Sequence, residues 1–121
     1  MSARAAGLTG AGPFRHGWLG NLFVWTLEPP VRLKLPAPKI FRPPLSQPPR
    51  ETVERFVRMQ DEIRTLLRDA DGVDLGRAKV ASPESARFKV TLGQAFRLIA
   101  AHERRHLWQA GKVKNMANFP R

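Results

Sequence analysis

The chain of 121 residues contains no cysteine, and this absence removes three kinds of chemistry at once. A protein without thiols forms no disulfide, holds no thiolate-bound metal and has no cysteine nucleophile. The chain also lacks the run of about 20 apolar residues that a membrane-spanning helix needs. Its best apolar stretch, residues 18–27, is far too short and includes Gly20, Asn21 and Thr26. We therefore expect no membrane partner, and the lack of cysteine fits a cytoplasmic location.

Acidic residues are scarce outside the middle of the chain. The formal net charge is +11, from 21 basic and 10 acidic residues. Only one acidic residue occurs in residues 1–50, eight occur in residues 51–85, and one in residues 86–121. Nucleic acid is the first partner that such a charge suggests. However, the basic residues are scattered, and neither an aromatic–glycine stacking motif nor zinc-finger spacing accompanies them. Specific nucleic-acid binding is not expected.

The first 49 residues divide into three stretches of different composition. Residues 1–17 are rich in Ala and Gly without periodicity, which predicts a disordered N-terminal segment. Residues 18–27 form a compact apolar patch, either helical or extended. Residues 28–49 contain eight prolines. Because proline lacks the amide proton and restricts the residue before it, this stretch predicts a long extended connection.

Two later stretches have the periodicity of amphipathic helices. Residues 50–70 place apolar side chains at spacings of three and four, and these predict a helix: Val53, Phe56, Val57, Ile63, Leu66, Leu67 and Ala70. Residues 91–113 predict a second helix, which Thr91 and Gln94 begin as a capping box. Residues 71–90 predict a loop with a short extended piece at residues 87–90. We expect the two helices to pack antiparallel.

A pair of histidines on the last predicted helix is the strongest candidate for a functional site. His102 and His106 are four residues apart, so their imidazoles lie one turn apart on the same face. At 100° per residue, both fall within an apolar arc that contains Ile99 and Ala110, which predicts that they face inward. Two neutral imidazoles at this spacing can share one metal ion. The alternative is a pair that only packs or binds backbone and water.

The pair also forms a literal H-E-x-x-H sequence over residues 102–106, the signature of zinc proteases. Those enzymes need a third ligand, usually further along the chain. Residues 107–121 contain no His, Asp or Glu. The sequence therefore argues against a protease, and Glu103 reads as an ordinary helix residue.

The last helix resembles that of a known family. The resemblance rests on residues Thr91–Gln94 and Ala101–Gln109. Phe14–Gly20 and the Pro-rich connection are weaker matches. Over roughly residues 14–114 the chain resembles the DinB-like superfamily. The resemblance implies a four-helix bundle around a three-histidine metal site, with an H-x-x-x-H pair here carried by His102 and His106. The third ligand comes from an early helix, where the chain offers only His16. Characterised relatives include metal-dependent thiol S-transferases.

The resemblance and the patterns together give one expected architecture. We expect an all-α fold, an incomplete up-down four-helix bundle with a long Pro-rich connection. Residues 1–17 would be a disordered segment, residues 18–114 the DinB-like helical domain, and residues 115–121 a tail. Since the family is longer at its start, the resemblance implies an N-terminal truncation. Core surface uncovered on that side would favour a homodimer.

The expected function is divalent-metal binding, with zinc or nickel held by His102, His106 and His16. A metal-dependent hydrolase or thiol S-transferase acting on a small thiol or other small molecule is the activity that the resemblance implies. Whether the protein is an enzyme is left open, and no catalytic residue is assigned. The alternative is a non-enzymatic helical interaction module, or a truncated remnant without a complete metal site.

Overall fold

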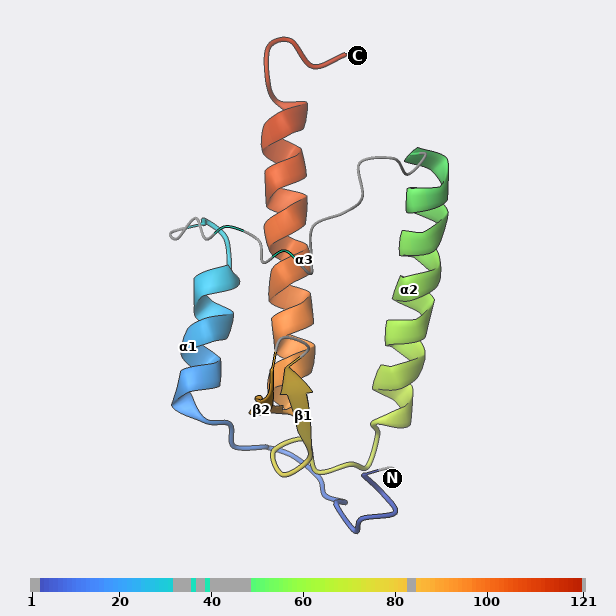
Figure 1. Ribbon diagram of the computed structural model, residues 1–121, viewed down its shortest axis with the longest axis vertical. Helices are drawn as coiled ribbons and strands as arrows, with labels where there is room; N and C mark the ends of the chain where they lie inside the picture. The colour runs from blue at the N-terminus through green and yellow to red at the C-terminus, as the bar shows by residue number, and fades with distance from the viewer. Residues whose placement is uncertain (1–2, 32–35, 37–38, 40–48, 83–84, 121) are drawn as a thin grey trace.

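Three helices and one small sheet make up the described part of the protein. The computed structural model describes residues 3–31, 36, 39, 49–82 and 85–120. Helix α1 spans Trp18–Leu27, α2 spans Pro49–Asp69 and α3 spans Leu92–Lys114. Strand β1 spans Lys79–Ser82 and β2 spans Ser85–Thr91. Helix α3 stands between the other two, parallel to α1 and antiparallel to α2 (Figure 1). No helix among the described residues is long and apolar enough to cross a bilayer.

Helices α1 and α3 form the best-packed pair. Val24 on α1 is 5% exposed and Ala101 on α3 is fully buried. Two polar contacts border this apolar seam: Arg97 Nη1 donates to Asn21 Oδ1 at 3.1 Å, and the Arg104 guanidinium is paired with the Glu28 carboxylate. Small side chains at the seam let the two helix backbones approach closely.

A buried polar contact joins the beginnings of α1 and α3. It is made by the side-chain amide of Gln94, which is 5% exposed. Its Nε2 donates to the carbonyl of Gly17 at 2.7 Å, and its Oε1 accepts from the amide of Thr91 at 3.2 Å. In return, Thr91 Oγ1 accepts from the amide of Gln94, which completes the predicted capping box. The amide lies directly against Gly20, where a Cβ would be 2.3 Å from Nε2.

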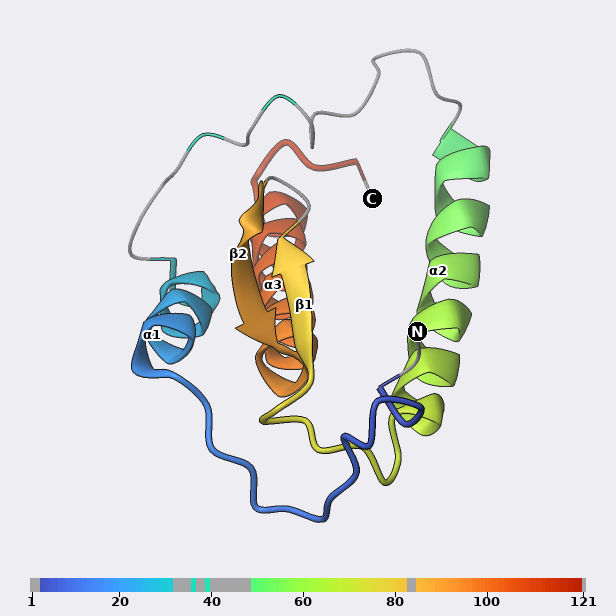
Figure 2. The same ribbon diagram turned by 60° about the horizontal axis from the view of Figure 1, so that its bottom comes forward.

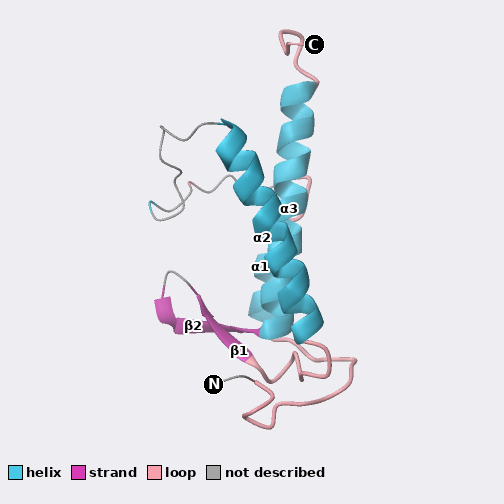
Figure 3. Ribbon diagram, turned by 90° about the vertical axis from the view of Figure 1, so that its right-hand side faces the viewer, coloured by secondary structure: helices cyan, strands magenta, loops and turns pink. Residues whose placement is uncertain are grey.

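The two strands form an antiparallel hairpin that leads directly into α3. Val80 pairs with Val90 and Ala81 with Lys89, and the register slips between Ala81 and Ser82. β-branched residues favour this extended pairing, and the sheet projects sideways from the helices (Figure 3). The extended piece predicted at residues 87–90 is thus part of β2, and β1 was not predicted.

Helix α2 stands apart from α3. Figure 2 shows it on the opposite side of α3 from α1. A cavity of about 180 Å³ lies between α2 and α3, lined by Ile63, Leu67, Phe96 and Ile99 among others. A hydrogen bond joins the two helices, from Gln60 Nε2 to Glu103 Oε1 at 2.7 Å. The predicted antiparallel direction is present, but the two apolar stripes do not interlock.

The expectation of an all-α, incomplete four-helix bundle is wrong. The described residues form three helices and a two-stranded antiparallel sheet. Residues 3–17 form turns and an isolated bridge from Thr9 to Val73 instead of helix, because Gly and Ala without periodicity give no apolar face to bury. The Pro-rich connection predicted at residues 28–49 lies largely outside the described residues.

The resulting core is small. Four apolar side chains are buried among the described residues: Val24, Val73, Ala78 and Ala101. Large apolar side chains of all three helices remain exposed, including Trp18, Phe56 and Leu107. Packing of α1 on α3 therefore carries much of what holds the fold together.

Replacing Gly20 by Ala tests that packing. A Gly-to-Ala change inside a helix ordinarily stabilises by about 0.5–1 kcal/mol. Here the new Cβ would collide with the buried Gln94 amide, so we expect G20A to destabilise by about 1–3 kcal/mol. Urea unfolding followed by circular dichroism measures the difference.

The matched control is Gly111, which also lies within a helix. No atom outside its local backbone lies within 4 Å of a Cβ built there, so G111A should stabilise the protein by about 0.5–1 kcal/mol. Equal effects of the two substitutions would contradict the close approach of α1 to Gln94.

Replacing Glu103 by Gln tests the bridge to α2. The change keeps the shape but removes the charge from the hydrogen bond that Gln60 donates, so we expect a loss of about 1 kcal/mol or less. Amide exchange in α2 should accelerate more than exchange in the first half of α3. The control E62Q changes an exposed carboxylate of α2 and should leave the exchange of α2 unchanged. Identical profiles for E103Q and the unsubstituted protein would show that the charge of Glu103 does not strengthen the bridge to α2.

Candidate metal centre

The predicted histidine pair lies on a face of α3 that neither neighbouring helix covers. Ala101 faces α1, and Glu103 faces α2. His102 lies between these two residues in sequence and is turned by about 100° from each. Both His102 and His106 are exposed. The prediction that they face inward is wrong: Ile99, on the same arc, is itself 38% exposed, and the two histidines lie beyond the part of the arc that borders α2.

The two imidazoles nevertheless converge. Nε2 of His102 and Nε2 of His106 are 2.7 Å apart. The ring centroids are 4.4 Å apart, and the ring planes meet at 68° in an edge-to-face arrangement. Successive turns of α3 thus direct the same nitrogen of each ring to one point, which is the geometry that the i,i+4 spacing predicted.

Gln109 selects the tautomer of His106. Its Oε1 lies 3.1 Å from His106 Nδ1, and an amide oxygen can only accept, so Nδ1 carries the proton. In the neutral ring Nε2 then holds a lone pair, which accepts the Nε2–H of His102. A proton on Nδ1 that is bound by a neighbouring group is also the arrangement that orients a metal-ligating histidine.

His102 is held in its neutral form. Partial burial lowers its pKa below the ordinary value of 6.5, and the neighbouring His106 and Arg105 lower it further. The carboxylate of Glu103 opposes them with a smaller effect in the other direction. At neutral pH His102 therefore offers an uncharged nitrogen, which is the form that binds a metal.

The donor pair fits a zinc or nickel ion in part. Zinc binds imidazole nitrogen at about 2.0–2.1 Å, so two ligands in tetrahedral geometry lie about 3.3 Å apart. The observed 2.7 Å would open by roughly 0.6 Å through small side-chain rotations. No group of three His, Cys, Asp or Glu residues suitable for a metal occurs among the described residues. The structure thus supplies two donors.

His16 is not brought to the pair. Its Nδ1 lies 2.8 Å from Thr91 Oγ1, and its ring lies so close to Gly93 that a Cβ there would be 2.4 Å from Cε1. Thr91 precedes His102 by 11 residues, which is roughly 16 Å along the helix axis. His16 belongs instead to the polar contacts at the beginning of α3.

Glu103 does not serve the histidines either. Its half-buried carboxylate accepts from Gln60 on α2, about 100° around the helix from His102. A metalloprotease base must face the water that the metal binds. The geometry agrees with the argument from sequence against a protease.

Two polar interactions near the pair were not predicted. Gln109 follows His106 by three residues, so the helical i,i+3 spacing was a usable signal for its role. The pairing of Glu28 with Arg104, one turn from the histidines on the neighbouring face, had no sequence signal because it joins α3 to the end of α1. This pair lowers the pKa of Glu28 chiefly through the hydrogen bond from Arg104.

Comparison with known protein families supports the resemblance that the last helix suggested. The family model of the DinB superfamily matches residues 12–110, which covers most of the chain. No curated protein and no solved structure matches this chain. The matched range includes α1, α2, the hairpin and all of α3 up to Ala110, with both histidines of the pair. The chain belongs to the DinB superfamily.

Proposed function

We propose that this protein binds a divalent metal ion, zinc or nickel, through Nε2 of His102 and Nε2 of His106. The observation that carries the proposal is the convergence of these two nitrogens at 2.7 Å on a rigid helix. Membership in the DinB superfamily supports it. Each side chain projects from regular helical backbone, so its position depends little on loop conformation.

Orientation and charge also favour ligation. The hydrogen bond from His106 to Gln109 fixes which nitrogen is free to bind, and the lowered pKa of His102 keeps that ring neutral. In the absence of an ion, the rings share one proton between the two Nε2 atoms. Binding an ion requires that this proton move from Nε2 to Nδ1 of His102, so that the ring stays neutral and Nε2 holds the lone pair.

The activity we propose is of the kinds that the family resemblance implies, thiol S-transfer or hydrolysis on a small molecule. A bound ion would supply Lewis acidity and lower the pKa of a thiol or water that it holds. The exposure of both histidines leaves the open side accessible to a small thiol or another small-molecule substrate. The protein's own part would be to hold and orient the ion through two fixed nitrogens.

A non-enzymatic helical interaction module is the second candidate. The observation in its favour is that each described helix exposes large apolar side chains, such as Phe23 on α1, Phe56 on α2 and Leu107 on α3. In this case the histidines would only bind each other. Unfolding that responds to neither chelator nor added zinc favours this candidate over the first.

Metal titration tests the proposal. We expect untagged, chelator-treated protein to bind one Zn²⁺ or Ni²⁺ per chain in calorimetry, and His102→Ala or His106→Ala to abolish the binding. Gln109→Ala removes only the group that orients His106 and should weaken binding roughly 10–100-fold.

His16→Ala provides the comparison. Because His16 contacts Thr91 at the far end of α3, its removal should leave metal affinity unchanged, with helicity checked by circular dichroism. Loss of affinity in a folded H16A variant would instead assign His16 to the site. The absence of binding by the unsubstituted protein would overturn the proposal.

The pH dependence follows from the sign of the pKa shift. The pKa of His102 lies below 6.5, so this ring stays deprotonated at lower pH than an ordinary imidazole. Metal affinity should therefore hold from pH 7.5 to about 6.5 as far as this ring is concerned. It should then fall by about tenfold per pH unit once the pH passes below the pKa of His102. Affinity that is flat between pH 7 and 4.5 would exclude imidazole ligands.

A further inference from the structure

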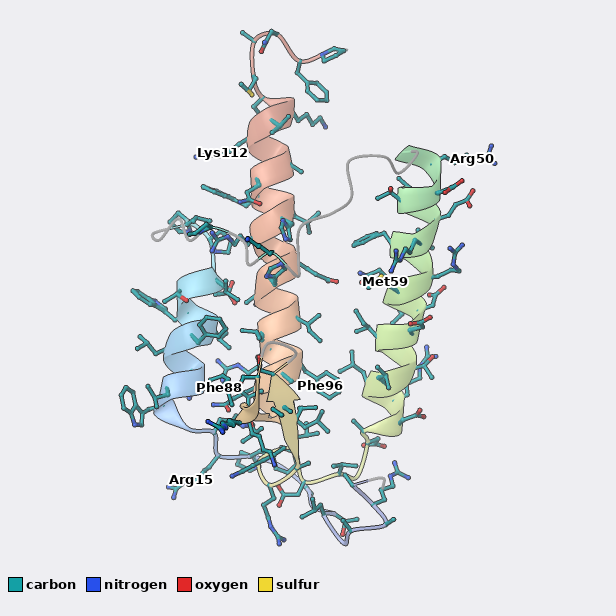
Figure 4. All side chains as sticks on the ribbon, in the orientation of Figure 1. Arg15, Arg50, Met59, Phe88, Phe96 and Lys112 are labelled. Carbon is teal, nitrogen blue, oxygen red and sulfur yellow. The ribbon has the colours of Figure 1, made fainter. Side chains whose placement is uncertain are left out.

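The face of α3 that carries His102 and His106 is open to a second molecule. Phe96 points from α3 toward α2 (Figure 4), and Ala101 packs toward α1. The two histidines are exposed and turned by about 80–140° from both of these directions. Helix α3 also continues well past the end of α1 (Figure 1). A partner can therefore approach the histidines without displacing either neighbouring helix.

The pair leaves half of a tetrahedral coordination open. Structural zinc sites in proteins almost always have four protein ligands. The chain supplies two, whose Nε2 atoms are 2.7 Å apart, and the part of the chain that the structure describes gathers no group of three His, Cys, Asp or Glu residues. The carboxylate of Glu28 is paired with Arg104, and that of Glu103 accepts from Gln60. A bound ion therefore takes its other ligands from water, a substrate or another protein molecule.

We propose that a zinc ion on this pair also binds His102 and His106 of a second copy of the chain, so that one ion joins two molecules. This use of the site rests on the metal binding proposed above. A two-fold axis through the ion presents the same surface of both copies, and it supplies four imidazole nitrogens without any further residue.

The shared ion has a consequence for the activity of the site. Four imidazole ligands complete the coordination of zinc, so the dimer has no position left for a thiol or water. An ion held by a single chain keeps open positions and remains able to act on a substrate. Formation of the dimer therefore switches the site off, and the ratio of metal to protein sets the switch.

Tetrahedral coordination also determines how the two copies of α3 meet. Side chains at positions i and i+4 lie one above the other, so the line between the two nitrogens of one copy runs broadly along its helix. In a tetrahedron, the lines that join opposite pairs of corners are perpendicular. The two helices therefore cross steeply at the ion, which is a less common class of helix packing. Such a crossing confines contact to the residues around the ion, so the ion holds the dimer together.

The charge of the chain makes the dimer depend on the ion. Each copy carries a formal charge of +11, so two copies repel one another. The homodimer expected from the sequence rested on uncovered core surface, which would join the chains without metal. In the dimer proposed here, the bonds from zinc to four nitrogens offset the repulsion, and the metal-free chain is a monomer.

Sedimentation of the untagged full chain with Zn²⁺ tests the proposal, in about 0.5 M NaCl to screen the repulsion. We expect a monomer without zinc and a dimer at about half an ion per chain, which is the ratio that a shared ion requires. At roughly tenfold excess of zinc the dimer should separate again, because each chain then binds an ion of its own by mass action. Excess metal thus still gives one ion per chain.

Ala110→Trp separates bridging from metal binding. Ala110 is exposed and follows His106 by one turn, so an indole there obstructs the second copy and leaves both Nε2 atoms free. We expect A110W to bind one Zn²⁺ per chain in calorimetry and to dimerise at least about tenfold more weakly. The variant H102A/H106A should neither bind zinc nor dimerise.

The matched control is Gly111→Trp, which places the same side chain on another face of α3. Gly111 is turned by about 140° from His106, and no atom outside its local backbone lies within 4 Å of a Cβ built there. G111W should therefore bind zinc and dimerise like the unsubstituted protein. Circular dichroism verifies that both tryptophan variants fold.

The dimer and the metal site fail in different ways. Zinc binding by a chain that stays monomeric at every ratio would overturn the dimer and leave the metal site intact, whereas the absence of zinc binding would overturn both. A dimer that forms without zinc, or persists in H102A/H106A, would assign association to exposed apolar surface instead. Equal dimerisation of A110W and G111W would place the contact away from the histidines and overturn the proposal.

Discussion

The rest of the fold depends on the amide of Gln94, which is buried between the beginning of α3 and the beginning of α1. The side-chain amide bonds to Gly17 and Thr91, and the backbone N–H of Gln94 bonds to Thr91 Oγ1, so one residue fixes the beginning of two helices. Burial of an amide is costly unless its hydrogen bonds are made, and here they are. The absence of a side chain at Gly20 is the condition for this arrangement, since any Cβ would occupy the position of the amide.

The contacts of Gln94 also hold the candidate site in place, because they fix the beginning of the helix that carries it. Helix α3 begins at the capping box and continues for 23 residues, with His102 and His106 near its middle. Packing against α1 extends to Arg104 through Glu28, so the turn that carries the histidines is held at one side. The opposite side is open, which explains why the histidines meet each other and Gln109 before any other group.

Local patterns predicted the elements better than their assembly. The stripe of residues 50–70 and the Thr91–Gln94 capping box located α2 and α3 within one or two residues, because helix formation depends on neighbours three and four apart. The same spacing predicted that His102 and His106 meet. Such patterns could not predict the hairpin, the exposure of the two histidines or the partner of Glu103, because each depends on which distant element covers a face. Gln94 was recognised as a cap, whereas its contact with Gly17 requires the docked α1.

The position of α2 has a consequence for how the protein unfolds. Between α2 and α3 lie a cavity and the side-chain bridge from Gln60 to Glu103, whereas α1, α3 and the hairpin share the buried residues around Ala101 and Ala78. Opening of α2 exposes little surface that is not already in water, so it costs less free energy than separation of α1 from α3. We therefore expect two cooperative units of unequal stability, with a thermal transition that departs from a two-state curve although the protein is small.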